Sequence, residues 1–485
     1  MKALYYILGV VLLTSTVSCN KYVDIENPKN QLVSSSVFVS DATATAAIVG
    51  IYSDMNAYNY QFANVLTTFM SAMSADEFAY AATFASFDEF KNNAISPDNT
   101  YVGILWSQPY DFIYRSNAII KGVTASTTLS AATKNQLLGE ARFVRAFCHF
   151  YLTNMFGDVP LILTDDVPTN SSLPRTPKAD VYAAVIADLV EAKRLLGTAY
   201  PGNLERTRPN KTAATLLLAR AYLYTGNNAQ AETEATEVIN TPNYSLLKNP
   251  DQTNAASMSK AFLKNSNEAI WQLQVVNTLG GRNTWEGNLM VPASSPLYRI
   301  TTGPNGLASA FEVGDKRYTN WVGIYNTTAT PPVTYYYPFK YKVRVGVSGA
   351  AATEYSMVLR FAEAYLIRGE ARIQQSKFSD GKDDLNVIRD RSGLTALGTP
   401  ASIAAGMTMV EQERRVELFA EWGHRWFDLK RWKSVTNVAG KSRADDVLPL
   451  IKTNWKSTAA LFPIPTEAMR TNPNMVQNPG YPGAK

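Results

Sequence analysis

Apolar side chains recur every three to four residues along most of the chain, which is the spacing of helices that bury one face. The pattern predicts helices within residues 41–55, 58–73, 105–120 and 138–147. Asp41 is suited to be the N-cap of the first helix, because a short acidic side chain accepts hydrogen bonds from first-turn amides. We therefore expect a mainly helical chain.

Two stretches of this pattern, residues 216–240 and 366–390, can be aligned without gaps. The first carries small and apolar residues at the spacing of a tetratricopeptide helix–turn–helix, namely Leu218, Ala219, Tyr222, Gly226, Ala231 and Ala235. Small residues stand where two helices touch, and the glycine stands in the turn. Such helix pairs cannot bury their apolar faces alone, so we expect them to stack into a superhelix.

Two regions interrupt the helical pattern, residues 74–100 and 249–352. The first is rich in aromatic and acidic residues without a steady period, and we expect a long ordered loop that carries function. The second is rich in Gly, Pro, Thr, Tyr and Trp, and its segments 270–276 and 335–347 predict strands. From residue 461 on, prolines exclude regular helix over most of the tail.

Charged and aromatic side chains are densest in residues 411–433. Gly423 predicts a bend between two helices in this stretch. So much charge beside so many rings favours a packed junction with buried ion pairs, and a catalytic centre is the alternative. The candidates for internal ion pairs are Glu417, Glu421, Arg425 and Asp428.

The composition is that of a globular protein, with 485 residues of which 46% are hydrophobic and 18% charged. The formal charge of +5 is small for this length, and no basic stripe stands out. Nucleic-acid binding therefore has no electrostatic footprint. Aromatic residues make up 11% of the chain, which suits both packing and a ligand surface.

The N-terminus predicts export. A positive start precedes an apolar run over residues 3–13, which is too short to cross a bilayer but typical of a secretory signal. Cys19 follows small and polar residues, as at the lipidation site of bacterial lipoproteins, although Thr16 stands where Leu is more usual. We expect residues 1–18 to be a lipoprotein signal peptide and residues 19–36 a polar tether. Ordinary signal cleavage beside an incidental cysteine is the alternative.

Residues suited to catalysis or metal binding are scarce. The only other cysteine, Cys148, and His149 lie in an apolar helical segment and are expected in the core, while His424 is expected at a turn or helix start. No nucleophile motif accompanies the histidines, and two His with one thiol are too few for zinc. Phosphate-loop, dinucleotide and EF-hand motifs are also absent, although scattered acids leave calcium binding open. We expect no catalytic residue, no cofactor and no metal site.

Asp76 and Glu77 are a pair of acids that opens the aromatic region 74–100. An acid there could accept hydrogen bonds from sugar hydroxyls while an aromatic face stacks on the sugar ring. A glycosidase needs two carboxylates about 5–10 Å apart across a cleft, and adjacency in sequence says nothing about that distance.

Several blocks of the chain resemble the SusD/RagB family of outer-membrane nutrient-binding lipoproteins. The most specific blocks are FGDVPL, ERRVELFAEWGHRWFDLKRW and FPIP…NPGY, and the resemblance covers essentially the whole length. In the commoner form of the second block Gly follows Glu directly, whereas Trp422 intervenes here.

The resemblance implies that residues 37–485 form a single domain. Its scaffold would be a tetratricopeptide-like helical superhelix, with repeats at about 138–240 and 355–433. An irregular, partly β ligand-facing lobe would comprise about 74–100 and 249–352.

The resemblance also implies a surface-exposed, lipid-anchored protein of the outer membrane that is not an enzyme. It would bind an oligosaccharide or polysaccharide and deliver it to a SusC-like TonB-dependent transporter for import. Peptide capture on the same scaffold and a surface glycosidase are the alternatives. The resemblance locates the ligand region, and residue character within it gives the candidate ligand-binding residues Asp76, Glu77, Tyr80, Phe84, Phe87, Trp285 and Trp321. Trp106 is expected in the core.

Overall fold

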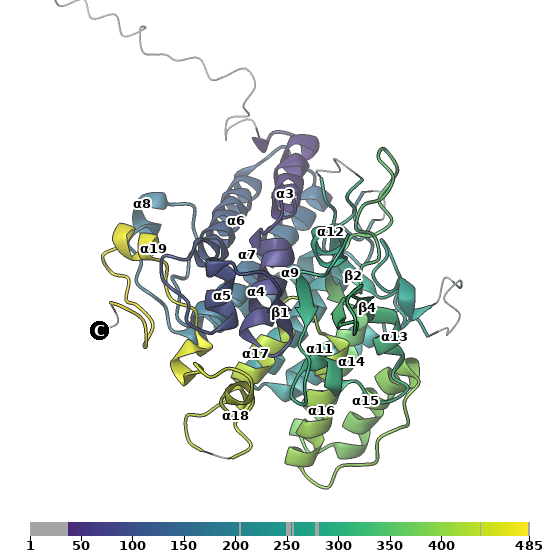
Figure 1. The fold of residues 1–485 in the computed structure, drawn as a ribbon. Coiled ribbons are helices and arrows are strands. Elements are labelled where there is room, and N and C mark those ends of the chain that lie inside the picture. The colour runs from purple at the N-terminus through teal and green to yellow at the C-terminus, as the bar shows by residue number, and fades with distance from the viewer. Residues whose placement is uncertain are drawn as a thin grey trace, which may run out of the picture.

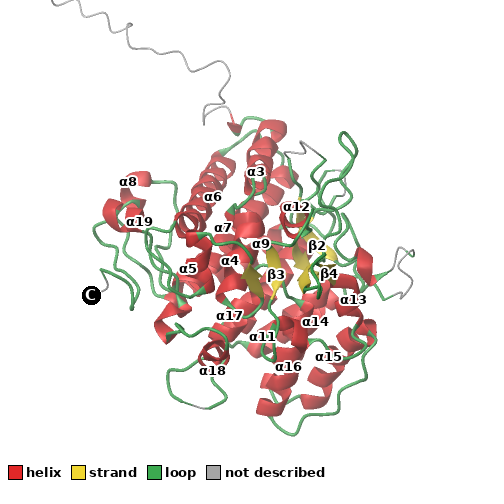
Figure 2. Cartoon of the chain, in the orientation of Figure 1, coloured by secondary structure: helices red, strands yellow, loops and turns green. Residues whose placement is uncertain are grey.

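The computed structural model describes residues 37–202, 205–248, 254, 257–276, 281–436 and 438–483. Helices make up most of this part of the chain, and its strands are short (Figures 1 and 2). The expected mainly helical fold class is confirmed. The expected signal peptide, Cys19 and the tether lie outside the described residues. No described helix is both long and apolar enough to cross a bilayer.

The N-terminal helices pack on one another. They are α3 (Asp41–Met55), the π-helix η2 (Phe62–Leu66), α4 (Thr67–Ser74), α6 (Thr100–Ala125) and α7 (Ala131–Phe156). The N-cap of α3 is Ser40 and not Asp41, because the Ser40 hydroxyl accepts a hydrogen bond from the Thr43 amide at 3.2 Å. Asp41 instead accepts a hydrogen bond from the Ser130 hydroxyl at 2.7 Å and so joins α3 to the start of α7. The helix expected over residues 58–73 begins only at its fifth residue.

A row of helices follows, in which each helix packs against a neighbour. It consists of α9 (Lys178–Leu195), α10 (Lys211–Tyr224), α11 (Asn228–Ile239), α14 (Phe361–Gln374), α15 (Phe378–Ser392) and α16 (Ile403–Glu417). The two predicted helix pairs are α10–α11 and α14–α15, and Gly226 lies in the first turn with a φ of +76°. The second pair touches at Gly381, where an added Cβ would lie 2.9 Å from the Gly369 carbonyl oxygen. Small residues therefore do stand where paired helices touch.

The strands form three antiparallel two-stranded ribbons. They are β1 (Phe78–Tyr80) with β3 (Tyr298–Ile300), β2 (Ala269–Leu273) with β6 (Ser356–Arg360), and β4 (Val322–Asn326) with β5 (Thr334–Pro338). The loop expected over residues 74–100 is thus wrong in part, because it contains β1 and α5 (Ala85–Lys91). The strand expected over residues 335–347 ends at Pro338. Lys340 and Tyr341 are both buried, which the alternating faces of a half-buried strand do not permit.

The remaining helices are short. They are α8 (Val167–Asn170), α12 (Trp285–Met290), α13 (Lys316–Trp321), α17 (His424–Arg431), α18 (Arg443–Val447) and α19 (Thr466–Thr471), with 3-10 turns η3 (Met258–Lys260), η4 (Leu307–Ala310), η5 (Leu448–Leu450) and η6 (Ser457–Ala460). The proline-rich tail, yellow in Figure 1, returns to the N-terminal helices, since the Phe462 amide donates to the Met155 carbonyl oxygen at 2.9 Å.

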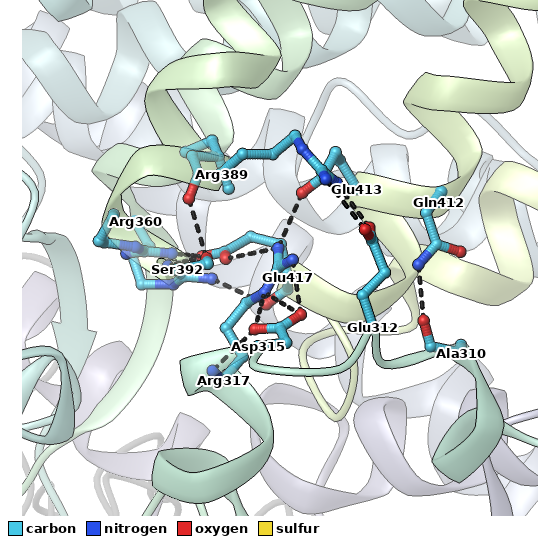
Figure 3. A network of polar contacts seen from close by, with 12 residues as sticks. Ala310, Glu312, Asp315, Arg317, Arg360, Arg389, Ser392, Gln412, Glu413 and Glu417 are labelled. Carbon is cyan, nitrogen blue, oxygen red and sulfur yellow. Dashed lines mark hydrogen bonds and ion pairs between the residues drawn. The ribbon is translucent and has the colours of Figure 1, made fainter. Parts of the chain in front are cut away.

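Residues 411–433 form the junction of α16 and α17. Gly423, with a φ of +72°, directly precedes α17, so the predicted bend is confirmed. Glu417 at the end of α16 is buried, and its carboxylate lies 2.6 Å from Arg360 and 3.6 Å from Arg317 (Figure 3). Burial alone would raise the pKa of Glu417, but the guanidinium groups of Arg391, Arg360 and Arg317 lower it to about 2.

The other predicted ion pairs of the junction are also confirmed. The carboxylate of Glu421 lies 2.9 Å from Arg360, and that of Asp428 lies 2.7 Å from Arg414. Glu421 and Arg425 stand four residues apart, the spacing of an ion pair on a helix. Arg425 binds Asp76 at 2.8 Å instead, because the chain is not helical between the end of α16 and the start of α17. The junction is a set of buried ion pairs.

Cys148 and His149 are buried in α7, as expected. The His149 Nδ1 lies 3.0 Å from the Arg145 carbonyl oxygen, and its Nε2 accepts a hydrogen bond from the Ile162 amide at 3.3 Å. His424 is the first residue of α17 and is also buried. Both imidazoles are core side chains.

Trp426 generates a prediction about stability. Its ring is fully buried and stacks on Phe462 with ring centroids 6.0 Å apart. We expect Trp426→Ala to lower the free energy of unfolding by about 3–5 kcal/mol, as large core truncations do. Chemical denaturation measures this loss, and Tyr58→Ala, whose ring is 64% exposed, is the control that leaves stability unchanged. Ligand specificity should also stay unchanged, and loss of binding by a fully folded Trp426→Ala protein would contradict the scaffold role.

Candidate functional site

The ribbon β1–β3 lies between a cluster of aromatic side chains and a cavity. Its residues pair as Phe78 with Ile300, Ala79 with Arg299, and Tyr80 with Tyr298. Because successive side chains of a strand point to opposite faces, Tyr80 and Tyr298 share one face and Arg299 lies on the other. The first face packs on aromatic side chains, and the second borders a cavity.

The first face belongs to an aromatic cluster, which consists of Tyr60, Phe69, Tyr80, Phe84, Phe87, Tyr101 and Tyr298. Phe87 lies at its centre, with ring centroids 4.7 Å from Phe84 and 5.0 Å from Tyr80. The hydroxyl groups of Tyr60 and Tyr298 hydrogen-bond to each other, and burial raises the pKa of Tyr60 to about 12. Phe84 is 45% exposed whereas Phe87 is buried, so the cluster presents rings to solvent from a fixed base.

The cavity on the other face has a volume of about 690 Å³. The β1–β3 ribbon, the end of α5, β5 and the segment 451–454 line it. Arg299 lies over the Tyr335 ring, with its guanidinium carbon 3.4 Å from the ring centroid. Lys452 donates hydrogen bonds to the carbonyl oxygens of Met73 and Ser74 at the end of α4. Burial lowers the pKa of Lys452 to about 7, although the Asp76 carboxylate raises it.

Asp76 is buried, and guanidinium groups cover its carboxylate. Arg425 lies 2.8 Å away and Arg415 2.9 Å away. Burial would raise the pKa of Asp76, but these two arginines lower it to about 2. In this structure Asp76 fixes the start of β1 to the junction, and a sugar hydroxyl would have to displace an arginine to reach it.

Glu77 is the other member of the acidic pair and is also buried. Its Oε1 has no hydrogen-bond partner in the part of the chain that is described. Burial and the neighbouring Asp76 charge raise the pKa of Glu77 to about 8. The side chain is therefore mostly a neutral acid at pH 7.

The two tryptophans expected at the site lie apart from the aromatic cluster. Trp285 is buried, and its indole N–H donates to the Asn56 carbonyl oxygen at 3.2 Å. Trp321 has no exposed surface and lies between Lys340 and Arg391, whose charged ends are 4.8 and 5.3 Å from its ring centroid. Of the seven expected ligand residues, the structure brings together Tyr80, Phe84 and Phe87.

Sequence reasoning missed several residues of the site. They are Tyr60, Tyr101, Tyr298, Arg299 and Lys452. The alternation of Tyr298, Arg299 and Ile300 was the one available signal, since it is that of a short strand with one apolar face. Trp106, expected in the core, is 8% exposed. Among the described residues no three His, Cys, Asp or Glu side chains converge to hold a metal ion.

Comparisons with known proteins cover both halves of the chain. The model of the SusD family matches residues 283–481, and a model described as "Starch-binding associating with outer membrane" matches residues 21–223. SusD-like protein P2 of Formosa agariphila is 27% identical over 98% of this chain and 99% of its own. A SusD-like protein of Bacteroides ovatus is 23% identical over 89% of this chain and 83% of its own.

Solved structures share the fold. A SusD superfamily protein from Bacteroides vulgatus superposes with a TM-score of 0.78 at 20% identity, over 92% of this chain and 100% of that one. A laminarin binding SusD-like protein gives 0.72 at 24% identity, over 91% and 99%. NanU of B. fragilis gives 0.73 at 20% identity, over 94% and 100%. The expected tetratricopeptide-like helical fold is confirmed.

Glu77 generates a prediction about pH. Its pKa is about 8 in the folded protein against an ordinary value of 4.5, so the stability that its neutral form contributes is complete below pH 4.5 and is lost as the pH rises to about 8. We expect the free energy of unfolding of Glu77→Gln to exceed that of the wild type over this range, and the difference to grow by up to about 1.4 kcal/mol per pH unit. Urea denaturation at a series of pH values measures the difference.

Asp76→Asn is the control, because its effect on the free energy of unfolding is expected to be opposite in sign to that of Glu77→Gln. The pKa of Asp76 lies below its ordinary value, so its contribution to stability is present above pH 3.8 and falls only as the pH drops towards 2. Asp76→Asn should thus be less stable than the wild type at neutral pH. A Glu77→Gln difference that does not vary with pH would contradict the raised pKa.

Proposed function

Because this chain belongs to the SusD family, we propose that it binds a carbohydrate at the aromatic cluster and the cavity beside it. The observation that carries the proposal is the exposed Phe84 ring, held by the buried Phe87 next to the partly exposed Tyr80. A sugar ring has an apolar C–H face that packs on an aromatic ring, and its hydroxyl groups need polar partners nearby. The cavity supplies such partners through Thr302, Thr453 and other polar side chains.

The proposed activity is binding without hydrolysis. A glycosidase needs a pair of carboxylates at its cleft. The cavity lining contains no Asp or Glu, and the nearby Asp76 and Glu77 are buried. Both histidines are core side chains, so neither offers a base to a bound ligand. These features support a binding protein.

We further propose that the protein is anchored on the cell surface through lipid on Cys19 and delivers its ligand to a SusC-like TonB-dependent transporter. The signal-like sequence before Cys19 supports the anchor. The description of the matching N-terminal family model, which names the outer membrane, supports the location. A transporter gene beside the gene for this protein would support the partner.

Phe84 tests the carbohydrate site. We expect Phe84→Ala to weaken binding of the protein's glycan about tenfold, a change of about 1.4 kcal/mol, because a stacking surface is removed. A glycan array identifies the ligand, and isothermal titration calorimetry measures the affinity. Tyr114→Ala is the matched control, since Tyr114 on α6 is 43% exposed and Phe84 is 45% exposed. Equal affinities of the two variants would contradict the proposed stacking role. Binding of peptides, with no binding of glycans, would show that the ligand is a peptide and not a carbohydrate.

Cys19 tests the anchor. We expect Cys19→Ala to release the protein from the membrane fraction, because the acylated sulfur atom is lost. Fractionation of the producing cells with detection of the protein measures its distribution. Cys148→Ala removes the other cysteine, which is buried in α7, and should leave the protein in the membrane fraction. A Cys19→Ala protein that stays membrane-bound would count against lipidation.

A further inference from the structure

The side chains that line the cavity carry charge of one sign only. Lys91, Arg299 and Lys452 are among its nineteen lining residues, and none of the nineteen is Asp or Glu. The protein as a whole has 46 Lys and Arg against 41 Asp and Glu, so cavities of mixed charge are the expected outcome. Three basic side chains without an acid distinguish this cavity.

These three cations also lack carboxylate partners elsewhere. Arg299 donates from Nε to the Pro296 carbonyl oxygen at 2.9 Å and from Nη2 towards the Ser295 hydroxyl at 3.3 Å, and neither partner is charged. Lys452 donates only to backbone carbonyl oxygens. Lys91 is exposed and forms no ion pair with any described residue. By contrast, the buried side chains of Arg360, Arg391, Arg414 and Arg425 all bind carboxylates.

Asp76, the acid that acts on Lys452, does not neutralise them. Asp76 influences Lys452 through space, but its carboxylate oxygens bind Arg425 and Arg415. The Nη1 group of Arg299 makes no hydrogen bond within the described chain, and the Tyr335 ring supports the guanidinium plane at 3.4 Å. A fixed planar guanidinium with free N–H groups is suited to carboxylate and sulfate oxygens. No acid among the lining residues offsets the positive charge of Arg299.

We infer that the cavity receives an acidic unit of the glycan, either the carboxylate of a uronic acid or a sulfate ester, with Arg299 as its principal contact and Lys91 beside it. This inference rests on the proposed carbohydrate binding and specifies the ligand's charge. The aromatic cluster across the ribbon would bind a neighbouring ring of the same chain. Thr302, Thr453 and Asn454 line the cavity around the cations and can bind the hydroxyl groups of the acidic unit.

The test is a glycan array of matched pairs followed by calorimetry. Polygalacturonate and its methyl ester differ in free carboxylate, and carrageenan and its desulfated form differ in sulfate. Neutral laminarin completes the set. We expect the purified full-length protein to bind at least one acidic member about tenfold more tightly than its neutral counterpart. The preference should shrink as NaCl rises from about 50 mM to 500 mM, because salt screens ion pairs at an exposed cavity.

Substitutions then assign the preference to the cavity. Arg299→Gln and Lys91→Gln should each reduce affinity for the acidic glycan about fivefold or more and reduce affinity for its neutral counterpart by a smaller factor. Lys121→Gln is the matched control, because it removes one positive charge at an exposed lysine outside the cavity that pairs with Asp165. Circular dichroism shows whether each variant is folded.

The outcomes separate this inference from the proposed function. Equal binding of charged and neutral partners, or a preference that survives both cavity substitutions, overturns the inference and leaves carbohydrate binding intact. Failure to bind any member of the array overturns carbohydrate binding and the inference with it. An acidic preference lost in Arg299→Gln and kept in Lys121→Gln supports both.

Discussion

The buried carboxylate of Glu417 is the interaction on which the arrangement of this protein depends. It forms ion pairs with guanidinium groups from three other segments, namely Arg317 in α13, Arg360 at the end of β6 and Arg391 in α15. Removal of one partner from a buried ion pair typically destabilises a protein by about 3–5 kcal/mol, because the remaining charge stays uncompensated. These ion pairs therefore form only when α13, the repeat helices and the junction are in place together, and this couples the position of the region 249–352 to the helical scaffold.

A second set of buried ion pairs connects the junction to the candidate site. Arg425 in α17 and Arg415 in α16 bind Asp76, which lies two residues before β1. The ribbon that separates the aromatic cluster from the cavity is thus tied at its first strand to the same junction as the repeats. Phe84 directly precedes α5 and packs on Phe87, and Arg299 lies in β3, whose partner β1 is tied to the buried ion pairs of Asp76. The proposed binding surface would thus be formed before the ligand arrives, which limits the entropy lost on binding.

The sequence predicted those features that repeat or cluster locally. The helix pairs followed from small residues such as Gly226, and the ion pairs of Glu417 and Asp428 followed from charge among rings in one short stretch. It did not predict pairings between distant segments. The sequence around Asp76 does not indicate that its carboxylate binds Arg425, which is 349 residues away. The sequence around Trp321 does not indicate that three cations surround its ring. Aromatic character alone could not distinguish exposed Phe84 from buried Trp321, because burial is set by such long-range partners.

The same contrast between paired and unpaired charge bears on function. Buried cations are costly without a partner, and the buried arginines in and around the junction each have one or more carboxylates within 3.1 Å. A lysine that caps a helix, as Lys452 does at the end of α4, needs no ligand to explain it. Arg299 is different, because its backbone and hydroxyl partners leave a full charge beside a cavity with no acid in its lining. Arg175 and Arg206 are also partly buried and donate only to carbonyl and amide oxygens, but of these three arginines only Arg299 borders the cavity, where the acidic unit that we propose would supply the missing negative charge.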